Sequence, residues 1–310
     1  MPFFLGIDGG GTKTRCVIGD EHSELATGRG SGCNIVRVGE ACARDSLSGA
    51  INEACVQAGV SPQQIARTCA GVAGAADDGV ASLVQRVLIG LVGGAIEVIG
   101  DMEIALESAS GGGAGVIVIA GTGAIAYGRN DRGEALRAGG WGRLISDEGS
   151  GHWIGAEAIR AALRAHDRTE NSLLLRLMIQ ELGAGDVHDV AVKANTDPVM
   201  DFAKLLPLVL LAAENGDKPA MQVLERAGRE LAETAAIVVE RLFSNAEHVS
   251  IATHGGVFAG SVLVKDAFRT ELHRLCPGAM CADVEVNPVL GALQRARREF
   301  SVWHKQGSAQ

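Results

Sequence analysis

Hydrophobic and polar positions follow the same plan twice along the chain. The opening, Phe3 to Gly30, reads FFLGIDGGGTKTRCVIGDEHSELATGRG, which predicts an apolar strand, a glycine turn, a second strand, a polar turn and a third strand. The segment from Gly115 to Gly140, GVIVIAGTGAIAYGRNDRGEALRAGG, repeats this order around its own glycine turn. Two copies of one supersecondary unit predict two related domains.

Alternating helix and strand patterns follow each copy. After the first copy, helices are expected near Glu40 to Ala58, near Gly79 to Leu91 and over MEIALESAS, with strands over RTCAGVAG and AIEVIGD. After the second, we expect helices between Gly155 and Phe243, a strand over HVSIATHGG, a helix from Val257, a strand over ADVEV and a closing helix from Asn287-Pro288. The predicted fold class is α/β, with two mixed β-sheets flanked by helices in lobes at 1–114 and 115–287.

Composition limits the class of protein and its ligands. The 310 residues are 47% hydrophobic and 21% charged, which is typical of a globular chain of about two domains. A net charge of −9 without a long basic run argues against nucleic-acid binding, so an anionic ligand would be held by backbone amides or a metal ion. The apolar run from Leu205 to Ala213 is too short to span a membrane. Seven cysteines without a CxxC pair indicate free thiols, and we therefore expect a cytoplasmic protein.

The first glycine turn has nearly the sequence of a P-loop, but its spacing is wrong. Thr12 stands between Gly11 and Lys13, where a P-loop has Gly-Lys-Ser/Thr directly. Glycines between two strands allow positive φ and close approach of a ligand, so a phosphate-binding hairpin and an ordinary hairpin both fit. In such sheets ligands bind beyond the carboxyl ends of strands and between domains. The elements expected there are the turns Gly9–Gly11 and Gly121–Gly123, Asp101 and the pair Gly255-Gly256.

Two aspartates are candidates for the chemistry. Asp8 ends the first strand beside the glycines, where a carboxylate next to phosphates is tolerable chiefly with a cation such as Mg²⁺ between them; the alternative is an Asp that caps the turn. Asp101 follows an apolar strand and precedes a helix, so it fits both a general base that accepts a hydroxyl proton and an N-cap. The hydroxyls of Thr12 and Thr122 could donate to phosphate oxygens, and Lys13 would add a positive charge.

The loop GGWGRLISDEGSGHWIG, from Gly139 to Gly155, combines aromatic and polar groups among glycines. Trp141 offers an apolar face and Asp147 a bidentate acceptor, a mixture that suits a carbohydrate. His152 has no partner ligands at metal-site spacing, and we expect a surface histidine. Asn34, in SGCNIV, either reads ligand groups or holds its loop.

The chain resembles the actin-like, sugar-kinase and heat-shock-ATPase superfamily. The motifs that carry this resemblance are GIDGGGTKT, SGCNI, GVAGA, VIGD, IAGTGAIAYG, GGWGRLISDEGSGHWIG, THGGV and NPVLGAL. Within this superfamily, the chain is similar to the N-acetylglucosamine kinase and glucosamine kinase branch of the BadF/BadG/BcrA/BcrD-type ATPases. The resemblance covers nearly the whole chain. It implies two ribonuclease-H-like lobes with ATP and Mg²⁺ in the cleft between them, and a last helix, 288–303, that packs back on the first lobe.

The resemblance also implies roles for individual residues. Asp101 would be the catalytic base toward the sugar 6-hydroxyl, and Asp8 would position Mg²⁺. The ATP-binding residues would be Gly9, Gly10, Gly11, Thr12, Lys13, Thr14, Gly121, Thr122, Gly123 and Ala124, with Gly255 and Gly256 against adenosine. The hexosamine would lie among Asn34, Trp141, Gly142 and Asp147. A homodimer is expected from the family alone.

Two features of the sequence bear on the alternatives. The related activator ATPases hold an iron–sulfur cluster through cysteines in the middle of the chain, and this chain has none between Cys69 and Cys276, which argues against a redox activator. The pair GGWG and DEGS favours N-acetylglucosamine over glucosamine as the substrate. A sugar sensor without catalysis is a third possibility, and the presence of both Asp8 and Asp101 argues against it.

Overall fold

The computed structural model describes residues 1–196, 200–243 and 248–307. By their internal contacts they form two compact units, one of Met1–Gly113 with the chain from Val284 onward, the other of Ala114–Asp283. Each unit is built on one five-stranded mixed sheet flanked by helices, as the repeated sequence plan predicts.

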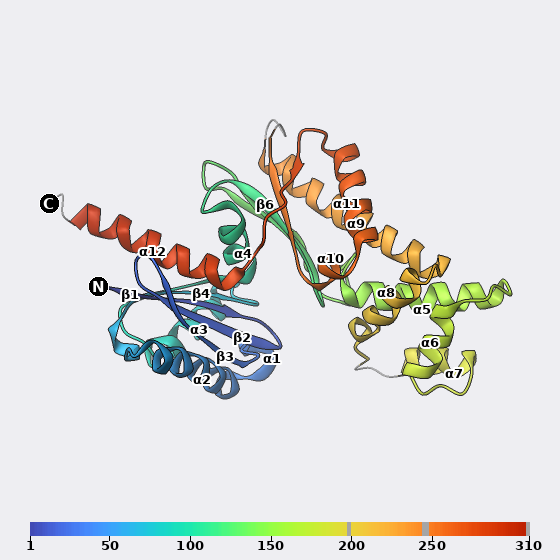
Figure 1. Ribbon diagram of the computed structural model, residues 1–310, viewed down its shortest axis with the longest axis horizontal. Helices are drawn as coiled ribbons and strands as arrows, with labels where there is room; N and C mark the ends of the chain where they lie inside the picture. The colour runs from blue at the N-terminus through green and yellow to red at the C-terminus, as the bar shows by residue number, and fades with distance from the viewer. Residues whose placement is uncertain (197–199, 244–247, 308–310) are drawn as a thin grey trace. The chain divides into compact units, whose positions relative to one another are not determined.

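The sheet of the first unit has the strand order β3-β2-β1-β4-β5 (Figure 1). Strand β1 pairs antiparallel with β2 and parallel with β4. The strands are β1 (Phe3–Gly9), β2 (Lys13–Gly19), β3 (Glu24–Ser31), β4 (Ile65–Val72) and β5 (Ala95–Gly100). The helices are α1 (Ile35–Val38), α2 (Glu40–Ala58), the 3-10 turn η1 (Pro62–Gln64), α3 (Asp78–Ile89), α4 (Asp101–Ser110) and α12 (Pro288–Gly307).

Local signals explain where these helices begin and end. The predicted helix at Glu40 to Ala58 is α2, which stops at Gly59 because that residue adopts the left-handed conformation, with φ 69°. Helix α3 begins after Asp77, whose carboxylate accepts from the N–H groups of Gly79 and Val80.

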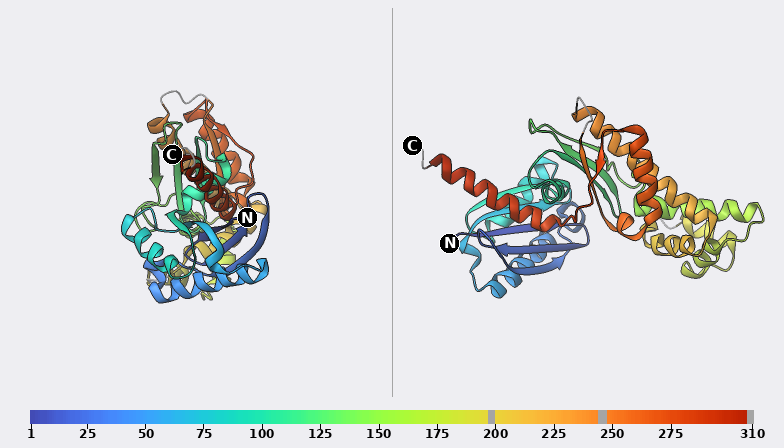
Figure 2. Two further views of the ribbon diagram at one scale, coloured as in Figure 1. Left: turned by 90° about the vertical axis from the view of Figure 1, so that its left-hand side faces the viewer. Right: turned by 45° about the horizontal axis from the view of Figure 1, so that its top comes forward.

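Alternate side chains of β1 enter two different cores. Leu5 and Ile7 pack with α2 and α3, whereas Phe4 packs with α4 and α12. On that second face a side chain at Gly6 would collide with the backbone of α12, so the glycine lets the helix approach closely. Helix α12 runs beside β1, as the right view of Figure 2 shows. Two ion pairs hold it there, from Arg295 to Glu97 at 2.7 Å and from Arg298 to the buried Glu107.

The sheet of the second unit repeats the topology of the first. Its order is β10-β9-β6-β7-β8, with β6 antiparallel to β7 and parallel to β9, so that β6 is the counterpart of β1. The strands are β6 (Gly115–Ala120), β7 (Ala124–Arg129), β8 (Ala135–Gly139), β9 (Ser250–His254) and β10 (Met280–Cys281). The helices are α5 (Gly151–Asp167), α6 (Leu173–Glu181), α7 (Val187–Thr196), η2 (Phe202–Leu205), α8 (Leu206–Glu214), α9 (Lys218–Leu242), α10 (Gly256–Gly260) and α11 (Val262–Leu275).

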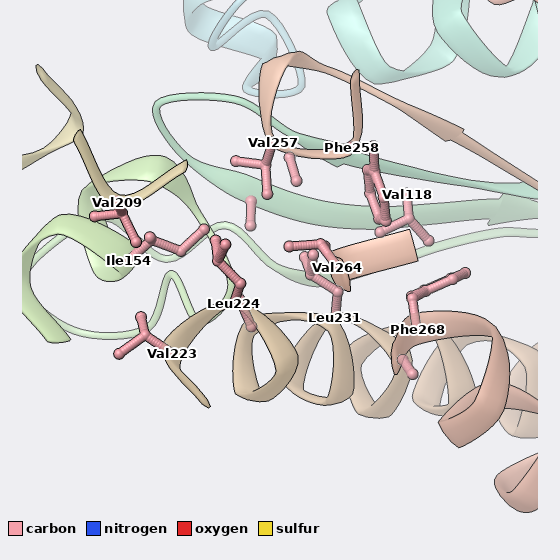
Figure 3. Close-up of a cluster of buried hydrophobic side chains, with 14 of the residues drawn as sticks. Val118, Ile154, Val209, Val223, Leu224, Leu231, Val257, Phe258, Val264 and Phe268 are labelled. Carbon is pink, nitrogen blue, oxygen red and sulfur yellow. The ribbon is translucent and has the colours of Figure 1, made fainter. Parts of the chain in front are cut away.

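One large apolar cluster joins the helices of the second unit to its sheet. Val118 of β6 contributes to it together with Ile154 of α5, Leu231 of α9 and Phe268 of α11 (Figure 3). Within the residues that the structure covers, no helix combines the length and apolarity needed to cross a bilayer.

The predicted strand ADVEV is wrong. Strand β10 covers only Met280–Cys281, and the hydrogen bond from Ala282 N to Ile251 O at 2.8 Å is the last that follows it along β9. Asp283 to Glu285 are exposed, because the second unit ends at Asp283 and the chain passes to the first unit there. Alternation of polar and apolar residues predicted a strand where the chain has no further pairing partner.

Candidate active site

The first glycine turn connects β1 to β2 at the carboxyl end of β1. Its ends are closed by the hydrogen bond from Gly10 N to Lys13 O at 2.9 Å. Two neighbouring segments support it, since Ala73 N donates to Gly9 O at 2.8 Å and Cys33 N donates to Gly10 O at 3.1 Å. In the part of the chain described, the N–H groups of Gly11 and Thr12 donate to no protein acceptor.

Of the two reasons expected from the sequence for glycines in this turn, positive φ does not apply. None of Gly9, Gly10 and Gly11 has a positive φ. A Cβ on Gly9 would lie 2.5 Å from Cys33 Sγ, so Gly9 is required by packing. A Cβ on Gly10 would meet only Lys13 O, at 3.3 Å, which leaves the outer side of the turn open to a ligand.

Asp8 lies near the end of β1 and Asp101 follows β5 of the same sheet, and the charge of Asp101 acts on Asp8. Burial, and next the charge of Asp101, raise the pKa of Asp8 to about 6, while Arg15 and Lys13 act in the opposite direction. Among the described residues nothing donates a hydrogen bond to the Asp8 carboxylate, so it does not cap the turn. Burial also raises the pKa of Asp101. Both carboxylates are therefore protonated more readily than a carboxylate in water.

Asp101 is not the N-cap of α4. Gly100 occupies the N-cap position of α4, and the Glu103 carboxylate accepts from Gly100 N at 3.0 Å. Asp101 is the first helical residue, and its Oδ1 accepts from the adjacent Met102 N, at 3.0 Å. The carboxylate is thus free of the capping role and available for chemistry.

The threonines and the lysine of the first turn face different ways. Thr12 and Lys13 are exposed. Thr14 is only 1% exposed, and its hydroxyl lies 2.7 Å from Ser31 O and 3.1 Å from Ser46 Oγ. The expected ATP contact of Thr14 stays a prediction, and its hydroxyl already has partners within the protein.

Asn34 holds its own loop. Its Oδ1 accepts from Arg37 N at 3.2 Å and so caps the four-residue helix α1. The loop brings a residue that the sequence did not single out to the turn, because a Cβ on Gly11 would lie 3.2 Å from Nη1 of Arg37. Arg15, which acts on Asp8, was also missed.

The second glycine turn connects β6 to β7 and is held from outside. Gly121 N donates to Gly123 O at 2.9 Å within the turn. The start of α5 supports it, with Gly151 N donating to Gly121 O at 2.8 Å and His152 N to Thr122 O at 3.3 Å. In the described chain the N–H groups of Thr122 and Gly123 have no protein acceptor, as in the first turn.

Asp147 is part of this second turn. Its Oδ1 accepts from Ala124 N at 2.7 Å, and its Oδ2 lies 3.2 Å from the position that a Cβ on Gly123 would take. Burial raises its pKa, and the hydrogen bond from Ala124 opposes that rise. One carboxylate oxygen thus orders the turn, while the other can accept from a ligand.

The remaining residues predicted around a sugar lie in an exposed loop of the second unit. Trp141 is 65% exposed, with the guanidinium carbon of Arg137 4.7 Å from its ring centroid. Gly142 has φ 103°, and Ile145 N and Ser146 N both donate to its carbonyl. The loop therefore has a defined local shape.

His152 is not the surface residue expected. It is 7% exposed, its ring packs edge-on against Phe202 at 5.1 Å, and burial lowers its pKa. Its Nδ1 is buried without a hydrogen-bond partner among the described residues. This neutral ring belongs to the packing beneath the second turn.

Gly255 and Gly256 join β9 to α10. Gly255 has φ 106°, and a Cβ there would collide with the carbonyl of Ala120, so only glycine fits. A Cβ on Gly256 would meet nothing within 4 Å.

Each unit thus brings together part of the predicted site. The first unit contributes Asp8, Gly9–Gly11, Thr12, Lys13, Asn34 and Asp101, and the second contributes Gly121–Gly123, Asp147 and Gly255. No set of three metal-ligating side chains occurs in the chain as described.

Comparison with known proteins identifies the lineage of these two units. The model of the BadF/BadG/BcrA/BcrD ATPase family matches residues 5–296. The chain belongs to this family. Within it, the chain is 33% identical to the N-acetylmuramic acid/N-acetylglucosamine kinase of Clostridium acetobutylicum, over 96% of this chain and 99% of that protein. It is 28% identical to the N-acetyl-D-glucosamine kinase of Dictyostelium discoideum, over 93% and 96%.

A solved structure shares the fold of this BadF/BadG/BcrA/BcrD family member. It is that of a Chromobacterium violaceum protein provisionally named an N-acetylglucosamine kinase, with a TM-score of 0.76 and 26% identity over 94% of this chain and 98% of that one. The actin-like fold class expected from the sequence is confirmed.

Proposed function

We propose that the chain is an ATP-dependent kinase that phosphorylates the 6-hydroxyl of an amino sugar, with N-acetylglucosamine the favoured substrate. The observation that carries this proposal is the pair Asp8 and Asp101, two carboxylates with raised pKa beside an open glycine turn. A protein that only bound sugar would need neither. The names of the two similar kinases support the choice of an amino sugar.

Each residue has one task in the proposed reaction. Asp101 accepts the proton of the sugar hydroxyl, and its raised pKa makes it a better acceptor near neutral pH. The hydroxyl oxygen forms a bond to the γ-phosphorus as the bond from that phosphorus to the β,γ-bridging oxygen breaks, and ADP leaves. Asp8 would hold Mg²⁺, directly or through water, and the ion would neutralise charge on the phosphate oxygens.

Each glycine turn offers backbone N–H donors of the kind that bind phosphate oxygens. Neighbouring segments fix the shape of both turns, and within the described residues the N–H groups of Gly11 and Thr12, and those of Thr122 and Gly123, have no acceptor. Donors fixed in this way stabilise charge without reorganising during the reaction. Homodimer formation stays a prediction from the resemblance.

The test is an ADP-release assay with Mg-ATP and a panel of acceptors. The panel contains N-acetylglucosamine, glucosamine, N-acetylmannosamine, N-acetylmuramic acid, glucose and no sugar. We expect ADP release to require an amino sugar and to be fastest with N-acetylglucosamine. Equal release with and without sugar would contradict the kinase and favour an activator-type ATPase, and a preference for glucosamine would correct the substrate.

A further inference from the structure

Arg37 occupies a position at the first glycine turn that its sequence motif does not explain. A Cβ on Gly11 would have the Arg37 Nη1 atom, at 3.2 Å, as its only neighbour within 4 Å. The guanidinium therefore lies against Gly11, in a turn where the N–H groups of Gly11 and Thr12 have no protein acceptor among the described residues.

The backbone of Arg37 is fixed, while its side chain is not engaged. Arg37 N lies 2.9 Å from Asn34 O and 3.2 Å from Asn34 Oδ1, and Ile35, two positions before it, is buried in the core. The side chain is exposed, and within the described residues its guanidinium makes neither an ion pair nor a hydrogen bond. Arg295 and Arg298 of the same unit, by contrast, both pair with carboxylates.

A guanidinium beside unpaired N–H groups is suited to an oxyanion. Arginine presents its N–H groups as a planar fork that matches carboxylate and phosphate oxygens, and such charge-assisted bonds are about twice as strong as neutral ones. The Asp8 carboxylate on the same turn interacts with Arg15 and Lys13 instead. The Arg37 guanidinium can therefore pair with the negative charge of a bound ligand.

We propose that Arg37 is a ligand-binding residue that holds an oxyanion of a substrate over the Gly10–Gly11 turn. The inference rests on the proposed kinase function for the identity of the substrates. The oxyanion can come from the triphosphate of the nucleotide or from a carboxylate carried by the sugar, as in N-acetylmuramic acid. Both sources present the same chemistry to the guanidinium, and they differ in which substrate loses affinity when Arg37 is changed.

The experiment compares the wild type with Arg37→Gln, Arg37→Lys and the control Arg86→Gln. Arg86 is an exposed arginine in the last turn of α3, so its substitution removes the same charge away from the turn. Binding of Mg-ATP and of inorganic triphosphate is measured by calorimetry, and KM is measured for N-acetylglucosamine and N-acetylmuramic acid. Circular dichroism and thermal unfolding establish that each variant is folded.

With the triphosphate as the source, Arg37→Gln weakens Mg-ATP and triphosphate binding about 10–100-fold, the worth of a charged hydrogen bond. With a sugar carboxylate as the source, it raises KM for N-acetylmuramic acid by a similar factor and leaves N-acetylglucosamine and ATP unchanged. Arg37→Lys restores part of either loss, because it keeps the charge without the fork. Loss no larger than that of Arg86→Gln in every measurement would overturn the proposal. The triphosphate titration remains informative even if no sugar is phosphorylated, so failure of the kinase proposal is seen separately.

Discussion

The two glycine turns stand at equivalent positions in two sheets of the same strand order, yet they treat their carboxylates differently. At the first turn, the Asp8 carboxylate comes from β1 itself and receives no hydrogen bond from the described residues. At the second, the corresponding strand β6 ends in Ile119 and Ala120, and the carboxylate is that of Asp147, which accepts from Ala124 N. Topology fixes where the turns lie, and neighbouring side chains decide what each can do. The first turn has an unsatisfied charge that suits a cation, whereas the second has a charge that partly serves the fold.

The largest effect is expected from Asp101→Asn, which removes the proposed general base. We predict that kcat falls about 10²–10⁴-fold, the range of a lost general base, while KM for both substrates changes little. Steady-state kinetics with the preferred sugar measures this. The matched control is Glu103→Gln, two residues along α4, which removes a charge but keeps an acceptor for Gly100 N. Near-normal turnover of Asp101→Asn would reduce Asp101 to a structural residue.

The second prediction concerns the protonation of Asp8. Its pKa of about 6 in the metal-free protein lies above the usual 3.8, so between these values the folded protein holds a proton that the unfolded chain releases. The contribution of Asp8 to the free energy of unfolding is therefore full below pH 4 and decreases as the pH rises through 6. The ¹³C shift of the Asp8 carboxyl, assigned by its loss in Asp8→Asn, should titrate near pH 6 without metal. With Mg²⁺ and a nucleotide it should titrate lower.

Asp20 is the control for this titration. Its exposed carboxylate accepts from His22 N and Ser23 N, and these hydrogen bonds lower its pKa below the usual 3.8. The pKa of Asp20 should not change when Mg²⁺ is added. An Asp8 titration near pH 4 without metal would remove the contrast between the two turns. In Asp101→Asn the pKa of Asp8 should fall, since the charge of Asp101 contributes to its rise.

The sequence could predict the features that depend on local pattern. The repeated strand order, the bounds of α2 and an acid directly after β5 all follow from periodicity and turn residues. The inward direction of Thr14 was also available, because Thr14 shares its strand face with the buried Cys16 and Ile18. The burial of His152 could have been read likewise from its spacing to Gly155 and Ile159 on one face of α5.

Other features arise only when distant segments meet. Arg37 lies against Gly11 because the loop after β3 folds back on the first turn, and no local pattern announces this contact. Asp147 reaches Ala124 across 23 positions of sequence. Its acidic, glycine-rich loop suggested a sugar ligand, and nothing in that loop pointed to the turn it supports.

The smallest effect is expected from Asp147→Asn. This substitution separates the two roles considered for the Asp147 carboxylate, which are support of the second turn and contact with the sugar. The amide oxygen of the variant can still accept from Ala124 N, so the turn and the thermal stability should be kept. If Oδ2 also accepts from the sugar, replacing it with an NH₂ donor should raise KM for the sugar about 10-fold with KM for ATP unchanged. Asp147→Ala should raise the same KM and, by leaving the N–H of Ala124 without its acceptor, also cost about 1–3 kcal/mol of stability. An Asp147→Asn variant with normal KM beside an unstable Asp147→Ala would mean that this carboxylate serves only the second turn, and that sugar recognition lies elsewhere in the loop around Trp141.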